Sequence, residues 1–289
     1  KNWKEDALRR DFTINSIYSD RDGNLFDPFN GKKDLETGVI NFIGNADERI
    51  KEDYLRILRY LRFYLNYSKQ PHNLETIRSL KKNLDGVSKL SKERLLDELK
   101  KIIKIETLEK LIKDELSLNL ILNIFPELKN IKIFSNLDIS KKKFLNEKDF
   151  IFFLSLMIID DTDNADYFIY KFKISKKDQK RLKLIDLFYK NKININDFTE
   201  KNFNKMFYFD GRQAVIDIIN FKIFKSKKID QNLVRLIEIY KDKKIPQLPV
   251  KTNLIMSKYN LVEGKKLGNK LKEIEIFWVK NNFQISDEE

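Results

Sequence analysis

Residues 52–63 of the chain read EDYLRILRYLRF, and charged and apolar residues recur in them at helical spacing. Residues three apart on an α-helix lie about 300° apart around its axis, so they line up along a slowly winding ridge. The stretch therefore predicts one helix with two ridges. These are a charged ridge of Asp53, Arg56, Arg59 and Arg62 and an apolar ridge of Leu55, Leu58 and Leu61.

The charged ridge suits a nucleoside triphosphate, because guanidinium groups bind phosphate oxygens with fixed forks and stay charged. Cytosine and adenine both present an amino donor beside a ring-nitrogen acceptor, whereas uracil and guanine present a carbonyl beside an N–H. An ionised Asp53 only accepts and Arg56 only donates, so this pair would satisfy C or A and mismatch U or G. The alternative is a solvated basic helix face, with Glu52 and Asp53 favouring the N-terminal end of the helix dipole.

Helical spacing extends from about Glu48 nearly to the end of the chain, and only residues 11–43 carry β-like patterns and turns. We expect strands near residues 12–18 and 39–43 and a turn at 22–24. A proline-containing linker is expected at 241–251, followed by an amphipathic helix at about 264–281. Four residues are good candidates for helix N-caps, namely Ser91, Asn146, Ser175 and Asp197.

The composition indicates a large, basic chain without cysteine. Its 289 residues are 42% hydrophobic, which is enough for two or more packed units. Fifty-seven Lys and Arg against forty-four Asp and Glu leave a formal charge of +13, which favours a nucleic acid partner unless the lysines only reflect a biased genome. Without cysteine no disulfide or thiolate site can form, and we predict a cytoplasmic location. No apolar run reaches membrane-spanning length, so no membrane partner is expected, and the single His72 is predicted to lie at the surface.

A second charged cluster, Arg9, Arg10 and Asp11, precedes the first. Its paired arginines could contact a triphosphate or a ribose, with Asp11 orienting one of them through a charge-assisted hydrogen bond. An ion pair at the entrance to a strand explains the cluster equally well. Between the two clusters, residues 22–35 combine two glycines and a proline with acids, which is typical of a mobile loop.

Four short motifs occur in order along the first hundred residues. They are RRDFTIN at 9–15, DPFNG at 27–31 with Asp34-Leu35, EDYLR at 52–56, and LSKER at 90–94 with Glu98-Leu99. Leu248-Pro249-Val250, Leu267-Gly268 and Trp278 follow in the tail. With these motifs the chain resembles the class II CCA-adding tRNA nucleotidyltransferases and the bacterial poly(A) polymerases. The resemblance is sharpest over residues 1–100 and looser through the later helices.

The resemblance implies a mainly α fold, in which the C-terminal part of an α/β nucleotidyltransferase head is followed by all-α neck, body and tail domains. We accordingly expect the remainder of the head at residues 1–50 and a neck that selects the nucleotide and binds RNA at 51–125. A helical body is expected at 126–245 and a tail at 246–289.

The resemblance also implies the site residues. Those that match the family's nucleotide-binding motifs, with their charged neighbours, are Arg10, Asp53, Arg56, Arg59, Arg62, Arg9, Asp11 and Glu52. Among them Asp53 and Arg56 match the pair that selects the base. Residues 20–35 match a flexible loop that helps the switch from C to A addition, and Arg94 and Glu98 match a neck-helix motif that steadies the head.

The family's catalytic centre is an Asp-x-Asp pair after a Gly-rich turn, which binds two metal ions for attack of the tRNA 3′ hydroxyl on the α-phosphate. No such pair precedes Arg9 and the first residue is not Met, so we expect a chain that begins within a longer protein. Two similar patterns, Asp20-Arg21-Asp22 and Asp161-Thr162-Asp163, are interpreted as surface carboxylates. No catalytic or metal-binding residue is assigned, and Mg²⁺ is expected to bind mainly through a preceding segment.

The activity implied by the resemblance is addition of C, C and A to tRNA 3′ ends from CTP and ATP, with release of diphosphate. The expected partner is the acceptor end of tRNA, and this chain alone is expected to be inactive. The alternatives are a bacterial poly(A) polymerase and a non-catalytic tRNA-binding fragment. The acidic residues 286–289 favour CCA addition over poly(A) synthesis, because the family's polymerases usually end in a basic extension. The residues indicate no oligomeric state.

Overall fold

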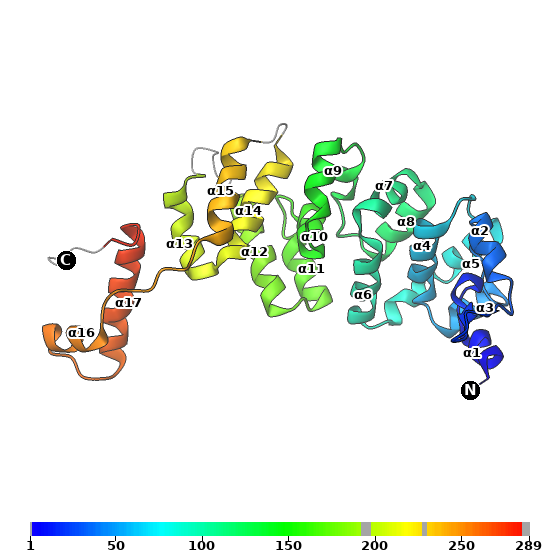
Figure 1. Ribbon diagram of the computed structural model, residues 1–289, viewed down its shortest axis with the longest axis horizontal. Helices are drawn as coiled ribbons and strands as arrows, with labels where there is room; N and C mark the ends of the chain where they lie inside the picture. Colours follow the sequence, from blue (N-terminus) through cyan, green and yellow to red (C-terminus); the bar gives the residue numbers. More distant parts are fainter. Residues whose placement is uncertain (1, 192–197, 227–229, 285–289) are drawn as a thin grey trace. The chain divides into compact units, whose positions relative to one another are not determined.

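A computed structural model describes residues 2–191, 198–226 and 230–284 of the chain (Figure 1). The chain divides into two compact units, Lys1–Ser175 and Lys176–Glu289. Helices make up most of both units, and the strands within the described residues form one short hairpin. The prediction of a mainly α fold is therefore confirmed. Asp197 and residues 286–289, which entered the sequence predictions, lie outside the described residues.

The β hairpin lies near the N-terminus. β1 (Tyr18–Ser19) pairs antiparallel with β2 (Leu25–Phe26), and Gly23 adopts a φ of +85° in the turn between them. Asp20 closes this turn, because its Oδ1 accepts a hydrogen bond from the backbone N–H of Asn24 at 2.8 Å. The turn predicted at residues 22–24 is confirmed, and the carboxylate of the first Asp-x-Asp pattern serves that turn.

Of the strands predicted at residues 12–18 and 39–43, only Tyr18 lies in a strand, at the start of β1. Phe12 and Phe42 make only an isolated antiparallel bridge, and η1 (Thr13–Asn15) is a 3-10 turn. The two rings pack with centroids 4.7 Å apart, and Phe12 is fully buried. The apolar alternation in this segment therefore reflects residues that point into a core, and it does not mark one face of a sheet.

Part of the predicted mobile loop is a helix, α2 (Gly31–Thr37). Gly31 lies so close to Thr13 that an added Cβ would clash with the Thr13 carbonyl oxygen. The Thr13 hydroxyl also donates to Asp34 Oδ2 at 2.6 Å. This glycine serves close packing of α2 on η1, so the prediction of a loop is wrong for residues 31–35.

The predicted site residues lie on or directly after three helices, α1 (Trp3–Arg9), α3 (Ala46–Glu52) and α4 (Arg56–Tyr67). α4 packs against α3, α6 (Lys92–Ile102) and α7 (Ile105–Lys113). The predicted apolar ridge is confirmed, because Leu55, Leu58 and Leu61 are all buried. Burial of each such side chain contributes about 1.5–3 kcal/mol of transfer free energy, which fixes α4 in the core.

His72 lies inside the fold, so its prediction as a surface residue is wrong. Its side chain is 3% exposed and stacks on the Tyr64 ring with centroids 3.6 Å apart. One ring nitrogen lies 2.9 Å from Tyr60 Oη and the other 3.0 Å from Oδ1 of Asp114, which caps α8 (Glu115–Ile124). Burial is tolerated because both nitrogens have partners.

The remaining elements of the first unit are α5 (Leu74–Lys82), η2 (Leu84–Lys89), η3 (Ile131–Phe134), α9 (Ile139–Asn146), α10 (Phe150–Ile158) and α11 (Asn164–Phe172). Ser91 caps α6 as predicted. Asn146 does not begin a helix; Asp149 caps α10 instead, directly before a continuous apolar run. Asp161 and Asp163 are exposed between α10 and α11, as expected for surface carboxylates.

The second unit contains α12 (Lys176–Lys190), α13 (Glu200–Asp210), α14 (Arg212–Lys225), α15 (Gln231–Asp242), α16 (Thr252–Tyr259) and α17 (Lys265–Lys280) (Figure 1). α14 packs against α12, α13 and α15. α12 begins directly after Ser175, as predicted. Residues 243–251 form the predicted linker without helix or strand, and α17 is the predicted last helix.

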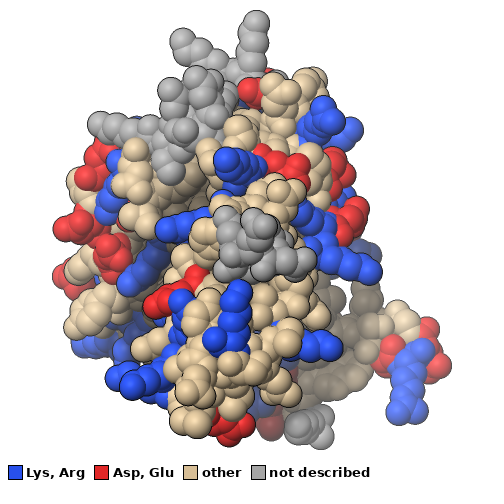
Figure 2. All heavy atoms as spheres, turned by 90° about the vertical axis from the view of Figure 1, so that its left-hand side faces the viewer, with Lys and Arg blue, Asp and Glu red and all other residues tan. Residues whose placement is uncertain are grey.

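The surface is rich in charge of both signs. On the face shown in Figure 2, lysine and arginine side chains are intermixed with acidic ones and do not gather into a single basic patch. Within the described residues, every helix is too short or too polar to cross a lipid bilayer.

Candidate functional site

The predicted charged ridge is interrupted at its first residue. α3 ends at Glu52, Asp53 has extended backbone angles (φ −154°, ψ 104°), and α4 begins at Arg56. Oδ1 of Asp53 accepts a hydrogen bond from the backbone N–H of Leu55 at 3.2 Å, an arrangement that competes with helix formation. The prediction that Asp53 and Arg56 share one helix is therefore wrong, and Glu52 lies at a helix C-terminus instead of an N-terminus.

Asp53 is held from another helix. Its Oδ2 accepts a 2.7 Å hydrogen bond from Arg94 Nη2 on α6. The side chains of Asp53 and Arg94 remain 31% and 48% exposed. The carboxylate is therefore fixed in direction yet still open to a ligand.

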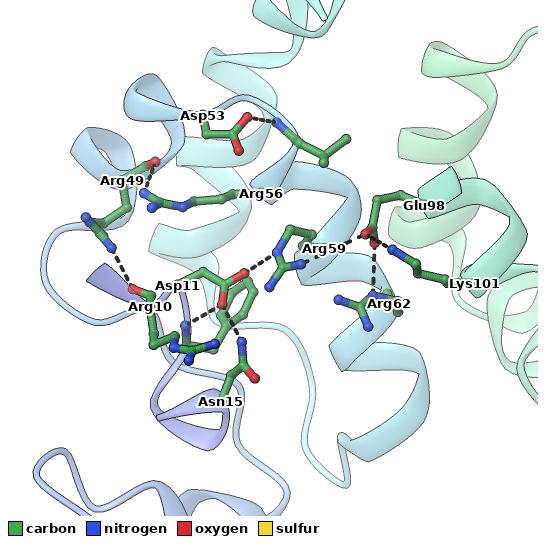
Figure 3. A network of polar contacts seen from close by, with 12 residues as sticks. Arg10, Asp11, Asn15, Arg49, Asp53, Arg56, Arg59, Arg62, Glu98 and Lys101 are labelled. Carbon is green, nitrogen blue, oxygen red and sulfur yellow. Dashed lines mark hydrogen bonds and ion pairs between the residues drawn. The ribbon is translucent and has the colours of Figure 1, made fainter. Parts of the chain in front are cut away.

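Arg56 binds the end of the preceding helix. Its Nη1 lies 2.6 Å from the backbone carbonyl oxygen of Arg49 and 2.7 Å from Glu52 Oε2. The hydrogen bond from Arg56, together with that from Arg49, outweighs the effect of burial and holds the pKa of Glu52 below its ordinary value. Figure 3 shows that Asp53 and Arg56 both extend from the region where α3 gives way to α4. The structure thus brings the predicted base-selecting pair to one turn.

Asp11 pairs with Arg59, and not with the neighbouring Arg9 or Arg10. The Arg59 Nε–H donates to Asp11 Oδ2, and the Asn15 side-chain amide donates to Oδ1 at 3.0 Å. Burial raises the pKa of Asp11, but these hydrogen bonds outweigh it, so the pKa lies below its ordinary value. The contact connects the RRDFTIN segment to α4.

Glu98 on α6 lies close to three cationic side chains. It is 3% exposed, and its oxygens lie 2.9 Å from Arg62 Nε, 2.8 Å from Lys101 Nζ and 3.9 Å from Arg59 Nη1 (Figure 3). A buried carboxylate needs such pairing, because an uncompensated buried charge is strongly destabilising. Arg59 and Arg62 keep 27% and 23% of their side chains exposed, so they can still meet phosphate oxygens.

Arg9 and Arg10 do not lead into a strand, because the segment that follows them forms the 3-10 turn η1. Both pair with Asp6 on their own helix, at 3.1 and 2.9 Å. The Tyr18 hydroxyl also donates to Asp6 at 2.8 Å, and the hydrogen bonds from Tyr18 and Arg10 hold the pKa of Asp6 below its ordinary value. Arg9 is largely exposed, whereas the main chain of Arg10 is tied to α3 by Arg49.

Sequence patterns missed Arg49 and Lys101. Arg49 precedes Arg56 by seven residues, or about two helical turns, so a helical pattern would place both on one face. The helix break at Asp53 removes that relation, and the actual contact runs from the Arg56 side chain to the Arg49 main chain. Lys101 stands three residues after Glu98 on α6, a spacing that does indicate an ion pair.

The acidic side chains of this site already form ion pairs with basic side chains. Asp11, Glu52, Asp53 and Glu98 each pair with at least one arginine. Within the described ranges there is also no group of three or more His, Cys, Asp or Glu residues that could hold a metal ion. These residues therefore do not fit a Mg²⁺ site. They offer guanidinium donors for phosphates and a carboxylate beside a guanidinium for a base edge.

Two segments on either side of the centre of this site match known family models. Residues 1–41 match a family model described as the poly A polymerase head domain, and residues 73–132 match one described as a probable RNA- and SrmB-binding site of polymerase A. The first contains Arg9, Arg10 and Asp11, and the second contains Arg94 and Glu98. α4 lies between them.

Similar proteins extend over nearly the whole chain. The mitochondrial CCA tRNA nucleotidyltransferase 1 of Mus musculus is 32% identical over 99% of this chain, and the CCA-adding enzyme of Staphylococcus haemolyticus is 32% identical over 94%. The chain spans 65% and 66% of the lengths of these relatives. The crystal structure of the Bacillus stearothermophilus CCA-adding enzyme in complex with CTP has the same fold, with a TM-score of 0.67 at 19% identity, covering 98% of this chain and 71% of that one. The chain belongs to the family of class II CCA-adding nucleotidyltransferases and bacterial poly(A) polymerases.

Proposed function

We propose that the protein containing this chain adds C, C and A to tRNA 3′ ends from CTP and ATP, with release of diphosphate. The chain would supply the residues that select the nucleotide and bind the RNA. The observation that carries the proposal is the position of Asp53 and Arg56 at the turn between α3 and α4, with one fixed carboxylate and one fixed guanidinium.

The chemistry of this pair supports selection of C and A. An ionised Asp53 accepts from the amino group of cytosine or adenine, and Arg56 donates to the neighbouring ring nitrogen. Uracil and guanine would set a carbonyl against Asp53 and an N–H against Arg56, which leaves buried polar groups unpaired. Since neither Asp53 nor Arg56 can reverse its role, the protein would choose the base without a template.

The other arginines support binding of the triphosphate. Arg59 and Arg62 follow Arg56 on α4 at spacings of three, and each is partly exposed while it pairs with a carboxylate. Guanidinium groups held in this way bind phosphate oxygens at little further entropic cost. Arg10, with Arg9, Asp11 and Glu52 beside it, completes the proposed nucleotide site.

The chain would be divided into four parts. Residues 1–50 would complete the head, 51–125 form the neck, 126–245 the body and 246–289 the tail.

Enzymes of this class generally use divalent metal, which supplies charge stabilisation at the reacting phosphates, and Mg²⁺ is the ion proposed here. The formal charge of +13 supports the acceptor end of tRNA as the partner. The proposed location is the cytoplasm.

The test is nucleotide incorporation into a tRNA that lacks its CCA end. The protein should be expressed as its gene encodes it, including any residues upstream of Lys1, and supplied with Mg²⁺ and each nucleotide separately and together. Addition of C, C and A followed by a stop is expected. Loss of activity on chelation, and its return with Mg²⁺, would support the metal requirement.

A poly(A) polymerase is the second candidate, because both matched family models are described by polymerase A. Open-ended incorporation of ATP into unrelated RNA, without use of CTP, would establish that function and overturn CCA addition. Retained tRNA binding without any incorporation would instead support a non-catalytic tRNA-binding fragment.

A further inference from the structure

We propose that Arg49 is a positioning residue that sets the main chain of Arg10 and the side chain of Arg56 in a fixed relation, and so aligns the triphosphate with the base. This inference rests on the proposed function, because Arg10 and Arg56 are its proposed nucleotide-binding residues. Arg49 itself would not touch the nucleotide.

One end of this link is the C-terminus of α1. Nη2 of Arg49 donates to the carbonyl oxygen of Arg10 at 2.5 Å and to that of Leu8 at 3.3 Å. The last carbonyl groups of a helix lack partners within the helix, and the helix dipole makes that end favourable for a cation. Arg49 therefore hydrogen-bonds to the RRDFTIN segment at Arg10, the residue that directly follows α1 (Figure 3).

The other end of the link is the C-terminus of α3. Arg49 lies in the last turn of α3, and its own carbonyl oxygen accepts from Arg56 Nη1 at 2.6 Å. Nη1 of Arg49 lies 2.5 Å from Glu52 Oε2, the same oxygen that Arg56 contacts. The side chain of Arg49 thus caps the C-terminus of α1, and the side chain of Arg56 caps the C-terminus of α3 in the same way.

Only arginine satisfies this set of contacts. The Arg49 side chain is 14% exposed and serves acceptors in two directions from two different nitrogens. A lysine ammonium is a point donor on a flexible stem, so it could keep the charge but not the planar fork. Replacement by lysine or methionine would therefore loosen Arg10 relative to Arg56 even where the fold survives.

The predicted consequence is a change in nucleotide use and base choice. Arg49→Lys and Arg49→Met should raise the KM for CTP and ATP by about tenfold or more, the fold-change that corresponds to about 1.4 kcal/mol. The preference for CTP over UTP should fall as well, because Glu52, whose Oε2 contacts both guanidinium groups, loses the Arg49 contact that helps to hold it beside Arg56. Arg78→Met is the matched control, since Arg78 is exposed on α5, away from these contacts.

The experiment measures kcat and KM for CTP, ATP and UTP with a tRNA primer, for the gene-encoded protein and the three variants, at a temperature where circular dichroism shows all of them folded. A raised KM with reduced base choice in both Arg49 variants, and neither in Arg78→Met, supports the positioning role. A lower unfolding temperature with unchanged KM and base choice in the folded protein would overturn it.

The test remains valid if the proposed function fails. If the wild-type protein adds only A, the KM for ATP in the Arg49 variants still decides the role of Arg49. If the wild-type protein adds nothing, equilibrium binding of CTP and ATP decides it, and unchanged affinity in both variants overturns the inference.

Discussion

Asp53 at the α3–α4 turn accepts a 2.7 Å hydrogen bond from Arg94 on α6. The carboxylate proposed to select the base is therefore held by a residue 41 positions later in the chain. Its direction depends on the packing of α6 against α4, and not on the turn alone. On the proposed function, the choice of nucleotide would therefore depend on α6 as well as on the turn.

Asp53→Asn should weaken base choice. The carboxamide both donates and accepts, so it can face the carbonyl of uracil or guanine that an ionised carboxylate repels. We expect the ratio of kcat/KM for CTP to that for UTP to fall by about tenfold or more, or about 1.4 kcal/mol. Asp85→Asn, at an exposed site, is the control. An unchanged ratio in Asp53→Asn would show that another group selects the base.

The Asp53–Arg94 pair should contribute little to stability. The Arg94 side chain is exposed and that of Asp53 partly so, and solvent screens such ion pairs. In a double-mutant cycle of Asp53→Ala and Arg94→Ala, measured by urea unfolding, we expect a coupling free energy of under about 1 kcal/mol. A much larger coupling would contradict the exposed geometry and would make loss of the fold the simpler explanation for any change in nucleotide use.

Much of α4 could be predicted from the sequence. The three-residue recurrence of Leu55, Leu58 and Leu61 predicts their burial, because a helix needs one apolar face against a core. The motifs also indicate Arg94 and Glu98. The structure adds that Arg94 forms an ion pair with Asp53 and that Glu98 forms one with Arg62.

The break before α4 and the burial of His72 could not be predicted in the same way. Asp53 stands where helical periodicity continues, and its extended backbone and its side-chain bond to the Leu55 N–H show that the helix breaks there. His72 has a loop-like sequence, but Asp114, which is 42 residues away, reaches its ring. Patterns of three or four residues do not contain contacts of this range.

Asp11 should make the fold sensitive to acid. Its pKa is lower in the folded protein than the unfolded value of about 3.9, so ionised Asp11 stabilises the fold above that pH. This contribution is lost as the pH falls below about 4 and passes through the folded pKa. Asp11→Asn should flatten the acid limb of the stability curve and cost about 1.5–3 kcal/mol at neutral pH, because Arg59 loses its charged acceptor.

Urea unfolding at a series of pH values measures the effect of Asp11. Asp22→Asn, in the exposed hairpin turn, should leave stability at neutral pH unchanged. An acid limb of equal steepness in Asp11→Asn and the wild type would assign the acid sensitivity to other carboxylates.

Gly86→Ala should disturb the turn that carries Asp53. A Cβ at Gly86 would overlap the ring of Tyr54, the residue that follows Asp53, while Lys89 Nζ lies 5.6 Å from the centroid of that ring. Overpacking of this kind costs about 1–3 kcal/mol, and displacement of Tyr54 should also raise the KM for CTP. Gly268→Ala is the matched control, because Gly268 lies within α17 with open space around it and alanine is favoured there by about 0.5–1 kcal/mol. Thermal unfolding should therefore move in opposite directions in the two variants. A shift in the same direction for both would show that Tyr54 yields to the added methyl group, and that the turn at Asp53 does not depend on this contact.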